Sequence, residues 1–301
     1  MSEDAGFGAL VARRVEERRS QIVLGLDPDP GRLWPQSAAA AGDGTGAEAA
    51  ASAVAHHCQA LIEAAGEACV AIKPQLACFE RLGAPGREAL GEACSAAREA
   101  GLLVIADGKR GDIDVSAAAY AAALFSGCDT PFGRVEGLGA DAATVNPYMG
   151  IDTLKTFAEV AEASGAGIFV LVRTSNPGAA DFEDLPTGSG AVWERVAASV
   201  AVLGGDGPGL AAVGAVLGAT EPEHLARARE LMPAAIFLLP GVGAQGGSVE
   251  ALAPAFVPGR AGGLVTASRS IANAGEQSGS DPARAARDEA ERLRELAWSL
   301  S

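Results

Sequence analysis

Short apolar runs alternate with Ala-rich segments along most of the chain, and this alternation limits the folds open to it. Eight runs are short and aliphatic enough to be strands: Gln21–Leu26, Cys69–Ile72, Leu102–Ala106, Ala142–Val145, Gly167–Val172, Ala212–Leu217, Ile236–Leu239 and Gly263–Thr266. Between them, apolar residues recur at helical intervals of three and four in Ala47–Ala65, Gly86–Ala100, Val115–Phe125, Asp152–Ala163, Ala191–Val202 and Pro222–Leu231. Strand and helix therefore alternate.

Strands that are apolar throughout are typical of a parallel sheet covered on both faces, and helical crossovers connect such strands. Eight units are enough to close a barrel. We therefore predict an α/β fold, a (β/α)8 TIM barrel that forms a single domain over residues 1–301. Its core spans about residues 21–271, with an N-terminal helix and a C-terminal helix at Pro282–Leu300 packed outside, the latter after a polar linker at Ala274–Asp281. A doubly wound open sheet is the alternative.

The charge and the composition of the chain limit the classes of partner that it can bind. The formal net charge of −15 would repel nucleic acid, because binding a polyanion depends on basic side chains. No apolar run approaches the roughly 18 residues that a membrane span needs, and the first residues lack the pattern of a secretory signal. We expect a cytoplasmic protein that binds neither nucleic acid nor membrane.

The cysteines and histidines indicate neither disulfides nor a metal. Five cysteines without a CxxC pair are expected to be buried free thiols: Cys58, Cys69, Cys78, Cys94 and Cys128. None of the three histidines has metal-ligand spacing to a carboxylate or cysteine, so no metal site is expected. His56 and His57 lie on a predicted helix remote from any strand end, and we expect them to be plain surface or interface residues.

Active sites of this fold lie at the carboxyl ends of the strands, and polar or Gly-rich segments follow seven of the eight. In chain order they are Asp27–Asp29, Lys73–Gln75, Asp107–Asp112, Asn146–Tyr148, Arg173–Gly178, Pro240–Gly247 and Ser268–Ser270. The last two suit a phosphate group, since glycines let backbone N–H groups approach a ligand and Arg269 carries a permanent charge. The alternative is that Gly241–Gly247 is only a flexible turn.

The third segment carries the sharpest signal. If the backbone stays extended, Asp107 and Lys109 share one face of their strand, with Asp112 further on and Lys73 on the adjacent strand. Four charges of alternating sign would then meet in one pocket, either as a catalytic group or as a structural ion-pair network. Only three of the 23 basic residues are lysines, which suggests that Lys73 and Lys109 serve as ammonium groups able to exchange a proton. The third, Lys155, is expected to be a solvated helix charge.

Together these motifs resemble orotidine 5'-monophosphate decarboxylase. The resemblance lies in Asp107-x-Lys109-x-x-Asp112, in Lys73 and Asp27, in Pro240-Gly-Val-Gly-Ala-Gln245-Gly-Gly, and in Ser268-Arg269-Ser270. The Lys73-Pro-Gln, Lys109-Arg-Gly-Asp, Thr144-Val-Asn-Pro-Tyr and Thr174-Ser-Asn-Pro-Gly runs are similar to the bacterial type 2 branch. The likeness covers about Gln21 to Ile271. This sequence departs from the family pattern at Ser116, where threonine is common, and at Asp114, where glycine is common.

The resemblance implies roles for these residues. Asp27 and Lys73 would bind ribose hydroxyls, Ser175 the pyrimidine, and Gln245 and Arg269 the phosphate. Asp112 would reach the neighbouring subunit's site in a homodimer. Lys73, Asp107, Lys109 and Asp112 form the expected catalytic set, and the expected substrate-binding set is completed by Ser116, Asn146, Pro240, Gly246 and Ser268.

The implied reaction is decarboxylation of orotidine 5'-monophosphate to uridine 5'-monophosphate, the last step of de novo pyrimidine nucleotide synthesis. The product carbanion has no cofactor to delocalise it, so preorganised charge must stabilise it. Lys109 would supply that charge and then protonate the ring carbon. The alternatives are a metal-dependent sugar-phosphate decarboxylase or aldolase on a related barrel, and a non-catalytic phosphate-binding barrel.

Overall fold

The protein is described by a computed structural model that covers residues 6–218, 222–241 and 249–301. Eight parallel strands close a barrel in the order β1-β2-β3-β6-β7-β10-β11-β12, with β12 returning to β1. Their bounds are β1 Ile22–Leu26, β2 Ala71–Pro74, β3 Leu103–Arg110, β6 Ala142–Val145, β7 Gly167–Arg173, β10 Val213–Leu217, β11 Phe237–Leu239 and β12 Gly263–Ala267. The predicted barrel and all eight predicted strands are confirmed, and the open sheet is excluded.

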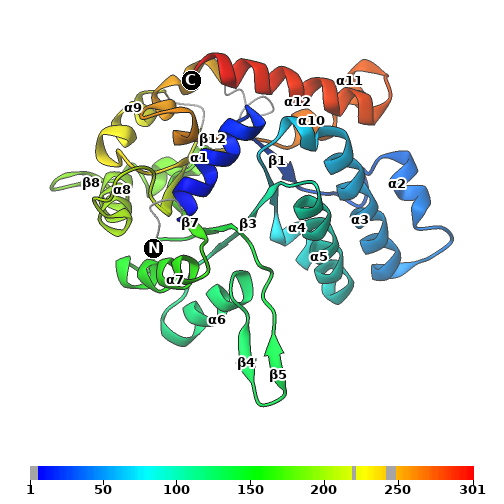
Figure 1. Ribbon diagram of the computed structural model, residues 1–301, viewed down its shortest axis with the longest axis horizontal. Helices are drawn as coiled ribbons and strands as arrows, with labels where there is room; N and C mark the ends of the chain where they lie inside the picture. The colour runs from blue at the N-terminus through cyan, green and yellow to red at the C-terminus, as the bar shows by residue number, and fades with distance from the viewer. Residues whose placement is uncertain (1–5, 219–221, 242–248) are drawn as a thin grey trace.

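Helices surround the barrel (Figure 1). Most crossovers carry one long α-helix: α3 Gly46–Ala65, α5 Gly83–Glu99, α6 Asp114–Leu124, α7 Ile151–Ala163, α8 Val192–Gly204 and α9 Pro222–Leu231. The crossover after β11 contains the 3-10 helices η3 Val249–Phe256 and η4 Arg260–Gly262 instead. Shorter elements are α2 Pro35–Ala40, η1 Gly66–Ala68, α4 Leu76–Glu80, η2 Pro177–Asp181, α10 Arg269–Ala272 and α11 Ala274–Ser278. The predicted linker at Ala274–Asp281 thus contains a short helix.

An N-terminal helix, α1 Phe7–Arg18, covers the amino end of the barrel (Figure 1). Its apolar residues Phe7, Val11 and Val15 share one buried cluster with side chains of the barrel interior, and the rings of Phe7 and Phe169 lie 6.0 Å apart edge to face. The approach is close: a Cβ at Gly8 would lie 1.8 Å from the carbonyl oxygen of Leu210. With this end closed, the carboxyl end is the one left for a ligand.

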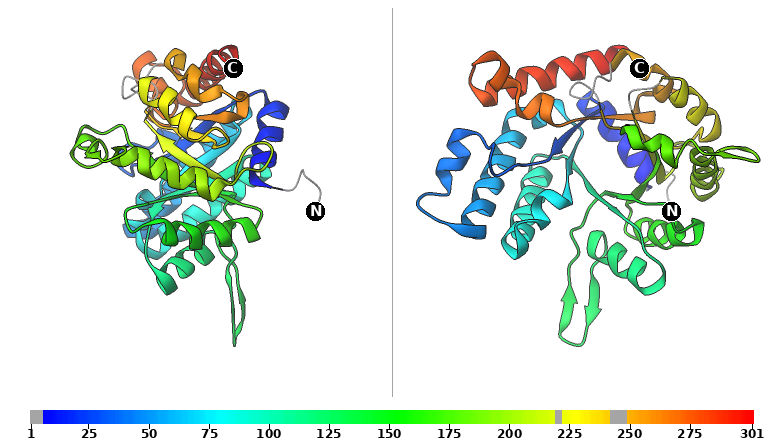
Figure 2. Two further views of the ribbon diagram at one scale, coloured as in Figure 1. Left: turned by 90° about the vertical axis from the view of Figure 1, so that its left-hand side faces the viewer. Right: turned by 180° about the vertical axis from the view of Figure 1, so that it is seen from behind.

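The C-terminal helix α12, Pro282–Ser299, packs outside the barrel as predicted. Asp281 caps its first turn by accepting a hydrogen bond from the Arg284 N–H at 2.9 Å. Buried residues recur at helical spacing along one face and settle it against α3 and β1: Ala286, Ala290, Leu293 and Ala297. Figure 2 shows the helix crossing one side of the molecule from behind.

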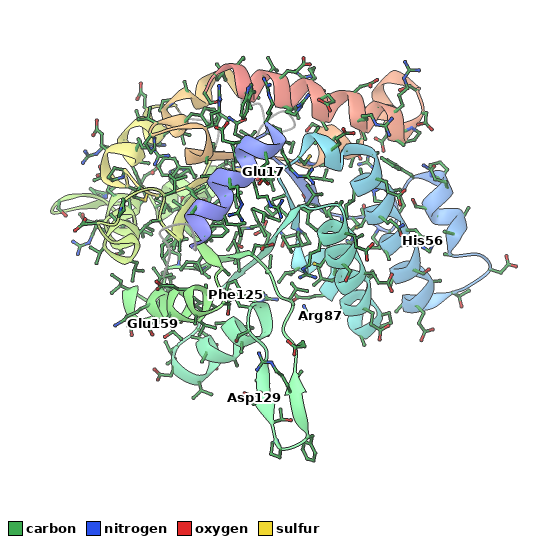
Figure 3. All side chains as sticks on the ribbon, in the orientation of Figure 1. Glu17, His56, Arg87, Phe125, Asp129 and Glu159 are labelled. Carbon is green, nitrogen blue, oxygen red and sulfur yellow. The ribbon has the colours of Figure 1, made fainter. Side chains whose placement is uncertain are left out.

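Two small hairpins were not predicted from the sequence. The first, β4 Cys128–Thr130 with β5 Gly133–Val135, projects from the body of the molecule (Figures 1 and 2), and Phe132 at its tip is 99% exposed. Arg134 forms ion pairs with Asp129 and Glu136 along this hairpin, of which Asp129 is labelled in Figure 3. The second pairs β8 Pro186–Thr187 with β9 Gly190–Ala191. These strands are too short and too polar for the alternation that indicates a strand.

The burial of each cysteine depends on the part of the fold that carries it. Cys58, Cys69 and Cys94 are buried free thiols as expected, whereas Cys78 is half-buried and Cys128 is exposed. The expectation was wrong for Cys128 because it lies on the projecting hairpin. Across the described ranges, no helix is both long enough and apolar enough to cross a membrane.

Phe169 tests how α1 and the barrel interior depend on each other. Replacing it with alanine should lower the free energy of unfolding by about 3–5 kcal/mol, because a fully buried ring is lost between β7 and α1. Denaturant unfolding of Phe169→Ala, with the exposed Phe182→Ala as control, measures this difference. Equal losses in the two variants would contradict the described core.

Candidate active site

Strand alternation explains why the polar side chains gather at one end of the barrel. Ala71, Ile105 and Ala142 belong to the apolar cluster of the barrel interior. Two residues further along each strand, on the same face, come Lys73, Asp107 and Thr144. The interior is therefore apolar toward α1 and polar at its carboxyl end.

A cavity of about 390 Å³ opens above this layer. Its polar wall comes from β2, β3, β6 and the segment after β7, and its apolar wall from β7, β10 and β11. The lining residues are Lys73, Asp107, Lys109, Thr144, Leu171, Thr174, Ser175, Asn176, Val216, Leu238 and Pro240. One charged wall facing an apolar wall suits a flat ring that carries a charged substituent.

The Asp107 carboxylate is the centre of the charged wall. Its Oδ2 receives Lys73 Nζ at 2.5 Å and Gln75 Nε2 at 3.2 Å. Its Oδ1 receives Lys109 Nζ at 2.5 Å and Thr144 Oγ1 at 2.8 Å. Three of the four charges predicted to meet are thus together, in the order ammonium, carboxylate, ammonium.

Burial and charge act in opposite directions on this group. Burial by itself raises the pKa of Asp107, but the charges of Lys73 and Lys109 and their hydrogen bonds lower it to about 2. Burial would likewise lower the pKa of Lys73, and the carboxylates of Asp107 and Asp27 outweigh it, so the pKa is raised. Lys73 and Asp107 are therefore both ionised at neutral pH.

The backbone departs from the expected extended form at Lys109. Its φ is 47°, in the left-handed region, and the pairing of β3 with β6 shifts register between Ala106 and Arg110. The side chain of Lys109 still reaches Asp107 but stays 41% exposed, whereas that of Asp107 is 5% exposed. Lys109 is therefore the most exposed of the three charged residues, although Lys73 and Asp107 also line the cavity.

Asp112 does not line this cavity. Its Oδ1 accepts the backbone N–H of Ile113 at 2.8 Å, and no ion pair with Lys73 or Lys109 is present among the described residues. Nearby, Asp114 has a φ of 42°, a conformation that favours glycine. This accounts for glycine being common there in the family that the sequence resembles.

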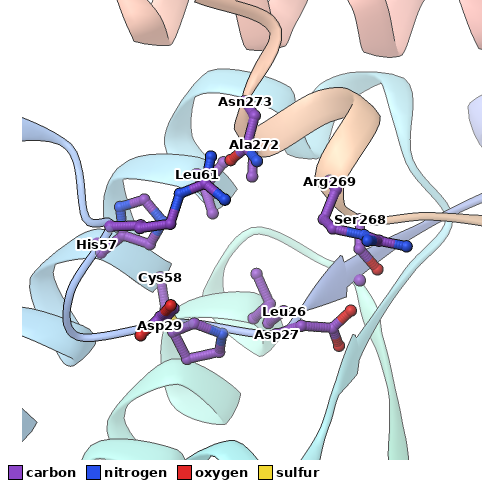
Figure 4. A pocket seen from close by; sticks show the side chains of 13 residues that line it. Leu26, Asp27, Asp29, His57, Cys58, Leu61, Ser268, Arg269, Ala272 and Asn273 are labelled. Carbon is purple, nitrogen blue, oxygen red and sulfur yellow. The ribbon is translucent and has the colours of Figure 1, made fainter. Parts of the chain in front are cut away.

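A second cavity, of about 140 Å³, lies beside β1 and β12 and contains Asp27, Ser268 and Arg269 (Figure 4). Arg269 begins α10 directly after β12, and Asp27 directly follows β1. Gly25 makes this approach possible, because a Cβ there would lie 1.8 Å from Ser268 Oγ. In Figure 4, His57 stands across the cavity from Arg269 and Asp27.

The predicted site residues therefore divide into four sets. Lys73, Asp107, Lys109, Ser175 and Pro240 line the larger cavity, and Asp27, Ser268 and Arg269 line the smaller one. Asp112, Ser116 and Asn146 line neither of these two, and Asn146 Oδ1 instead accepts the Tyr148 N–H at 3.0 Å. Gln245 and Gly246 lie outside the described residues.

The segment after β7 is held by its own ion pairs. Arg173 at the end of β7 binds Asp184 through Nε at 2.8 Å, and Glu183 accepts the N–H and the hydroxyl of Thr174. These contacts fix the backbone immediately before Ser175.

Lys155 lies exposed on α7 beside Glu159, as expected of a solvated helix charge.

His57 contradicts its sequence-based interpretation. It is buried rather than on the surface, its Nδ1 accepts the Trp34 N–H at 3.3 Å, and the two rings meet edge to face. Burial lowers the pKa of His57 to about 4. The expectation failed because α3 is covered at this point by the segment before α2, which no pattern in the sequence indicated. His56 is exposed, as expected.

Sequence reasoning also assigned no role to Gln75 and Thr144, although both bind Asp107. Strand alternation was the signal that could have indicated them: Gln75 lies two residues after Lys73, and Thr144 lies two residues after the inward-facing Ala142. Within the described ranges, no group of three or more His, Cys, Asp or Glu side chains could hold a metal ion.

Comparisons with known proteins agree with one another. A sequence model of the "Orotidine 5'-phosphate decarboxylase / HUMPS family" matches residues 20–287. Proteins named orotidine 5'-phosphate decarboxylase from Deinococcus radiodurans and Halorubrum lacusprofundi are 43% and 40% identical, over 88% and 90% of this chain and 88% and 89% of theirs. The structure of Leishmania donovani OMP decarboxylase superposes with a TM-score of 0.71 at 33% identity, covering 97% of this chain and 99% of that one.

The buried state of His57 predicts a loss of stability in acid. Its pKa is depressed to about 4 from 6.5, so below pH 6.5 the unfolded chain binds a proton that the folded chain does not. Stability therefore falls as the pH drops toward 4, by about 2 kcal/mol at pH 5 from this residue.

Urea unfolding at pH 7.5 and pH 5 measures the effect. His57→Gln should lose about 2 kcal/mol less than the wild type between the two pH values. The exposed neighbour serves as the matched control, and His56→Gln should behave as the wild type does. The same loss in all three proteins would contradict a neutral, buried His57.

Proposed function

Because the chain belongs to the orotidine 5'-phosphate decarboxylase / HUMPS family, we propose that it converts orotidine 5'-monophosphate to uridine 5'-monophosphate and carbon dioxide. This reaction is the last step of de novo pyrimidine nucleotide synthesis. The observation that carries the proposal is the group Lys73, Asp107 and Lys109 at the floor of the larger cavity.

The charges of this group suit a reaction that forms a carbanion. When the substrate loses its carboxylate as carbon dioxide, the bonding electron pair stays on the ring carbon. A cation fixed beside that carbon stabilises the pair without having to reorganise. Lys109 is the accessible cation, and its contact with Asp107 limits where its ammonium can lie. The ammonium then gives its proton to the ring carbon, which completes the product.

Asp107 and Lys73 prepare the site for this step. Asp107 stays ionised at any working pH because its pKa is held at about 2. A substrate carboxylate placed beside it would meet a like charge, which raises the free energy of the bound ground state. Lys73, buried and paired with the other carboxylate oxygen, keeps Asp107 charged and oriented. We also propose that Lys73 binds a ribose hydroxyl together with Asp27, whose charge contributes to the raised pKa of Lys73.

The remaining binding roles follow the two cavities. Ser175 and Pro240 line the larger cavity, the proposed ring cavity, where Ser175 is proposed to bind the pyrimidine. Asp27 lines the smaller cavity and is proposed to bind ribose hydroxyls. Arg269 and Ser268, with Gln245 and Gly246, are proposed to hold the phosphate. Ser116 and Asn146 are proposed as further substrate contacts. Binding energy from the phosphate can help to close the site over the ring, which strengthens every charge inside it.

The alternative activities are not favoured. The relatives described above are named orotidine 5'-phosphate decarboxylase, and they align over most of both chains. A metal-dependent sugar-phosphate decarboxylase or aldolase therefore has less support. A non-catalytic phosphate-binding barrel would have no use for two ammonium groups on one buried carboxylate in the ring cavity.

A homodimer completes the proposed site. Asp112 lies outside the larger cavity of its own chain. Exposed apolar side chains occur at the start of α6 and from the end of the segment after β6 to the first residue of α7: Ile113, Val115, Tyr148, Met149 and Ile151. Val115 and Tyr148 are 83% and 89% exposed. Such a surface is typical of an interface. A twofold contact there would carry Asp112 into the partner's cavity, where it becomes the fourth charge.

Two broader proposals accompany this one. Residues 1–301 form one domain, since α1 belongs to the same buried cluster as the barrel interior and α12 packs on β1 and α3. The protein works in the cytoplasm, because three of its cysteines are buried as free thiols and a nucleotide substrate is found there.

Lys109→Ala should abolish turnover while leaving the affinity for uridine 5'-monophosphate largely intact, because the proton donor is lost but the phosphate and ribose contacts remain. Loss of orotidine 5'-monophosphate absorbance in a buffer containing a chelator measures turnover, and calorimetry measures binding. Lys155→Ala is the matched control and should turn over as the wild type does. Near-normal turnover by Lys109→Ala would refute the assigned proton donor.

Mixing two inactive variants tests the shared site. In a heterodimer of Asp112→Asn and Lys109→Ala subunits, one cavity combines an intact Lys109 with the partner's intact Asp112. Equal mixing with subunit exchange should restore roughly a quarter of wild-type activity, since half of the dimers are mixed and each has one intact site. If Asp112 acted within its own chain, the mixture would stay inactive.

A further inference from the structure

Thr144 joins the two residues on which the chemistry depends. It lies on β6, 1% exposed, with its side chain in the ring cavity beside β3. Its Oγ1 accepts the backbone N–H of Lys109 at 2.9 Å and lies 2.8 Å from Asp107 Oδ1. One hydroxyl thus contacts the main chain of the proton donor and the carboxylate that pairs with it.

The direction of each hydrogen bond follows from the groups involved. The Lys109 N–H can only donate, so Thr144 Oγ1 is its acceptor. The ionised carboxylate of Asp107 can only accept, so the single hydroxyl proton of Thr144 points to it. The hydroxyl therefore has no proton left to offer a substrate, and its influence on the reaction must pass through Asp107 and Lys109.

The backbone of β3 explains why this tie is needed. Regular pairing of β3 with β6 ends at Ala106 and resumes at Arg110, so the Lys109 N–H has no partner in the regular ladder. Lys109 also has a φ of 47°, a left-handed conformation that is unfavourable for a non-glycine residue. The Thr144 hydroxyl gives that N–H an acceptor in the conformation that turns the lysine back toward Asp107.

We propose that Thr144 is a positioning residue, which fixes the backbone of Lys109 and the carboxylate of Asp107 relative to each other and so sets where the ammonium stands over the substrate ring. The inference rests on the proposed decarboxylase activity and deepens it. It assigns a role on the neighbouring strand to a residue that is neither charged nor in contact with the reacting atoms.

The test compares Thr144→Val with Thr144→Ser. Valine matches threonine in shape but can neither accept the Lys109 N–H nor donate to Asp107, whereas serine can do both. Turnover, KM and the affinity for uridine 5'-monophosphate are measured for both variants and the wild type. Thr144→Val should lose on the order of 100-fold in kcat, the scale of a displacement of about 1 Å, with KM and product affinity nearly unchanged. Thr144→Ser should keep most of the wild-type kcat.

The serine variant gives a readout that a packing role would not change. Thr144→Ser lacks the methyl group but keeps the hydroxyl that contacts the Lys109 N–H and Asp107. A kcat near that of the wild type in Thr144→Ser, beside a large loss in Thr144→Val, therefore separates the two hydrogen bonds from packing. Should the valine variant not fold, Thr144→Ala removes the same hydroxyl without adding a methyl group and takes its place in every measurement.

The outcomes separate this inference from the proposal beneath it. If the wild type does not decarboxylate orotidine 5'-monophosphate, the proposed function itself is wrong. If the wild type is active and the hydroxyl-free variant has the same kcat, the role of Thr144 is refuted. Equal losses in the serine and hydroxyl-free variants would also refute it, because packing would then account for the effect.

Discussion

The ion pairs that Asp107 makes with Lys73 and Lys109 are the interaction on which the functional end of this barrel depends. A buried carboxylate is costly unless it is paired, and here both oxygens carry an ammonium group and a neutral donor. The two lysines are not equivalent. Lys73 is enclosed and holds the carboxylate in place, whereas Lys109 remains accessible from the cavity. In the proposed mechanism, that asymmetry separates Lys73, which stabilises the carboxylate, from Lys109, the proposed proton donor.

The barrel supplies the positions from which these groups meet. Strand alternation sets Lys73, Asp107 and Thr144 into one layer above an apolar interior, and α1 seals the opposite end. Among the described residues, the carboxyl end of the barrel, where the charges lie, is therefore the end that is left for a ligand. Arg269 and Asp27 stand at the adjoining cavity, so a molecule with a ring at one end and a phosphate at the other has a place for each.

Much of this arrangement could be predicted because the signals were long or repeated. Eight apolar runs indicated the barrel, and the polar residues directly after them indicated the rim. The rest depended on contacts that leave little trace in a sequence. The left-handed turn at Lys109 arises from a register shift between two strands, the burial of His57 from a segment that folds over α3, and the β4–β5 hairpin from two strands of three residues. Thr144 carried a weak signal, its place in the inward alternation of β6.

The crystal structure of the protein with bound uridine 5'-monophosphate is the most direct measurement of the central claim. The account predicts that Lys109 Nζ stays on Asp107 and faces the ring carbon that receives the proton, with the phosphate beside Arg269. A nucleotide seated elsewhere, or a Lys109 side chain turned to solvent and away from Asp107, would contradict it.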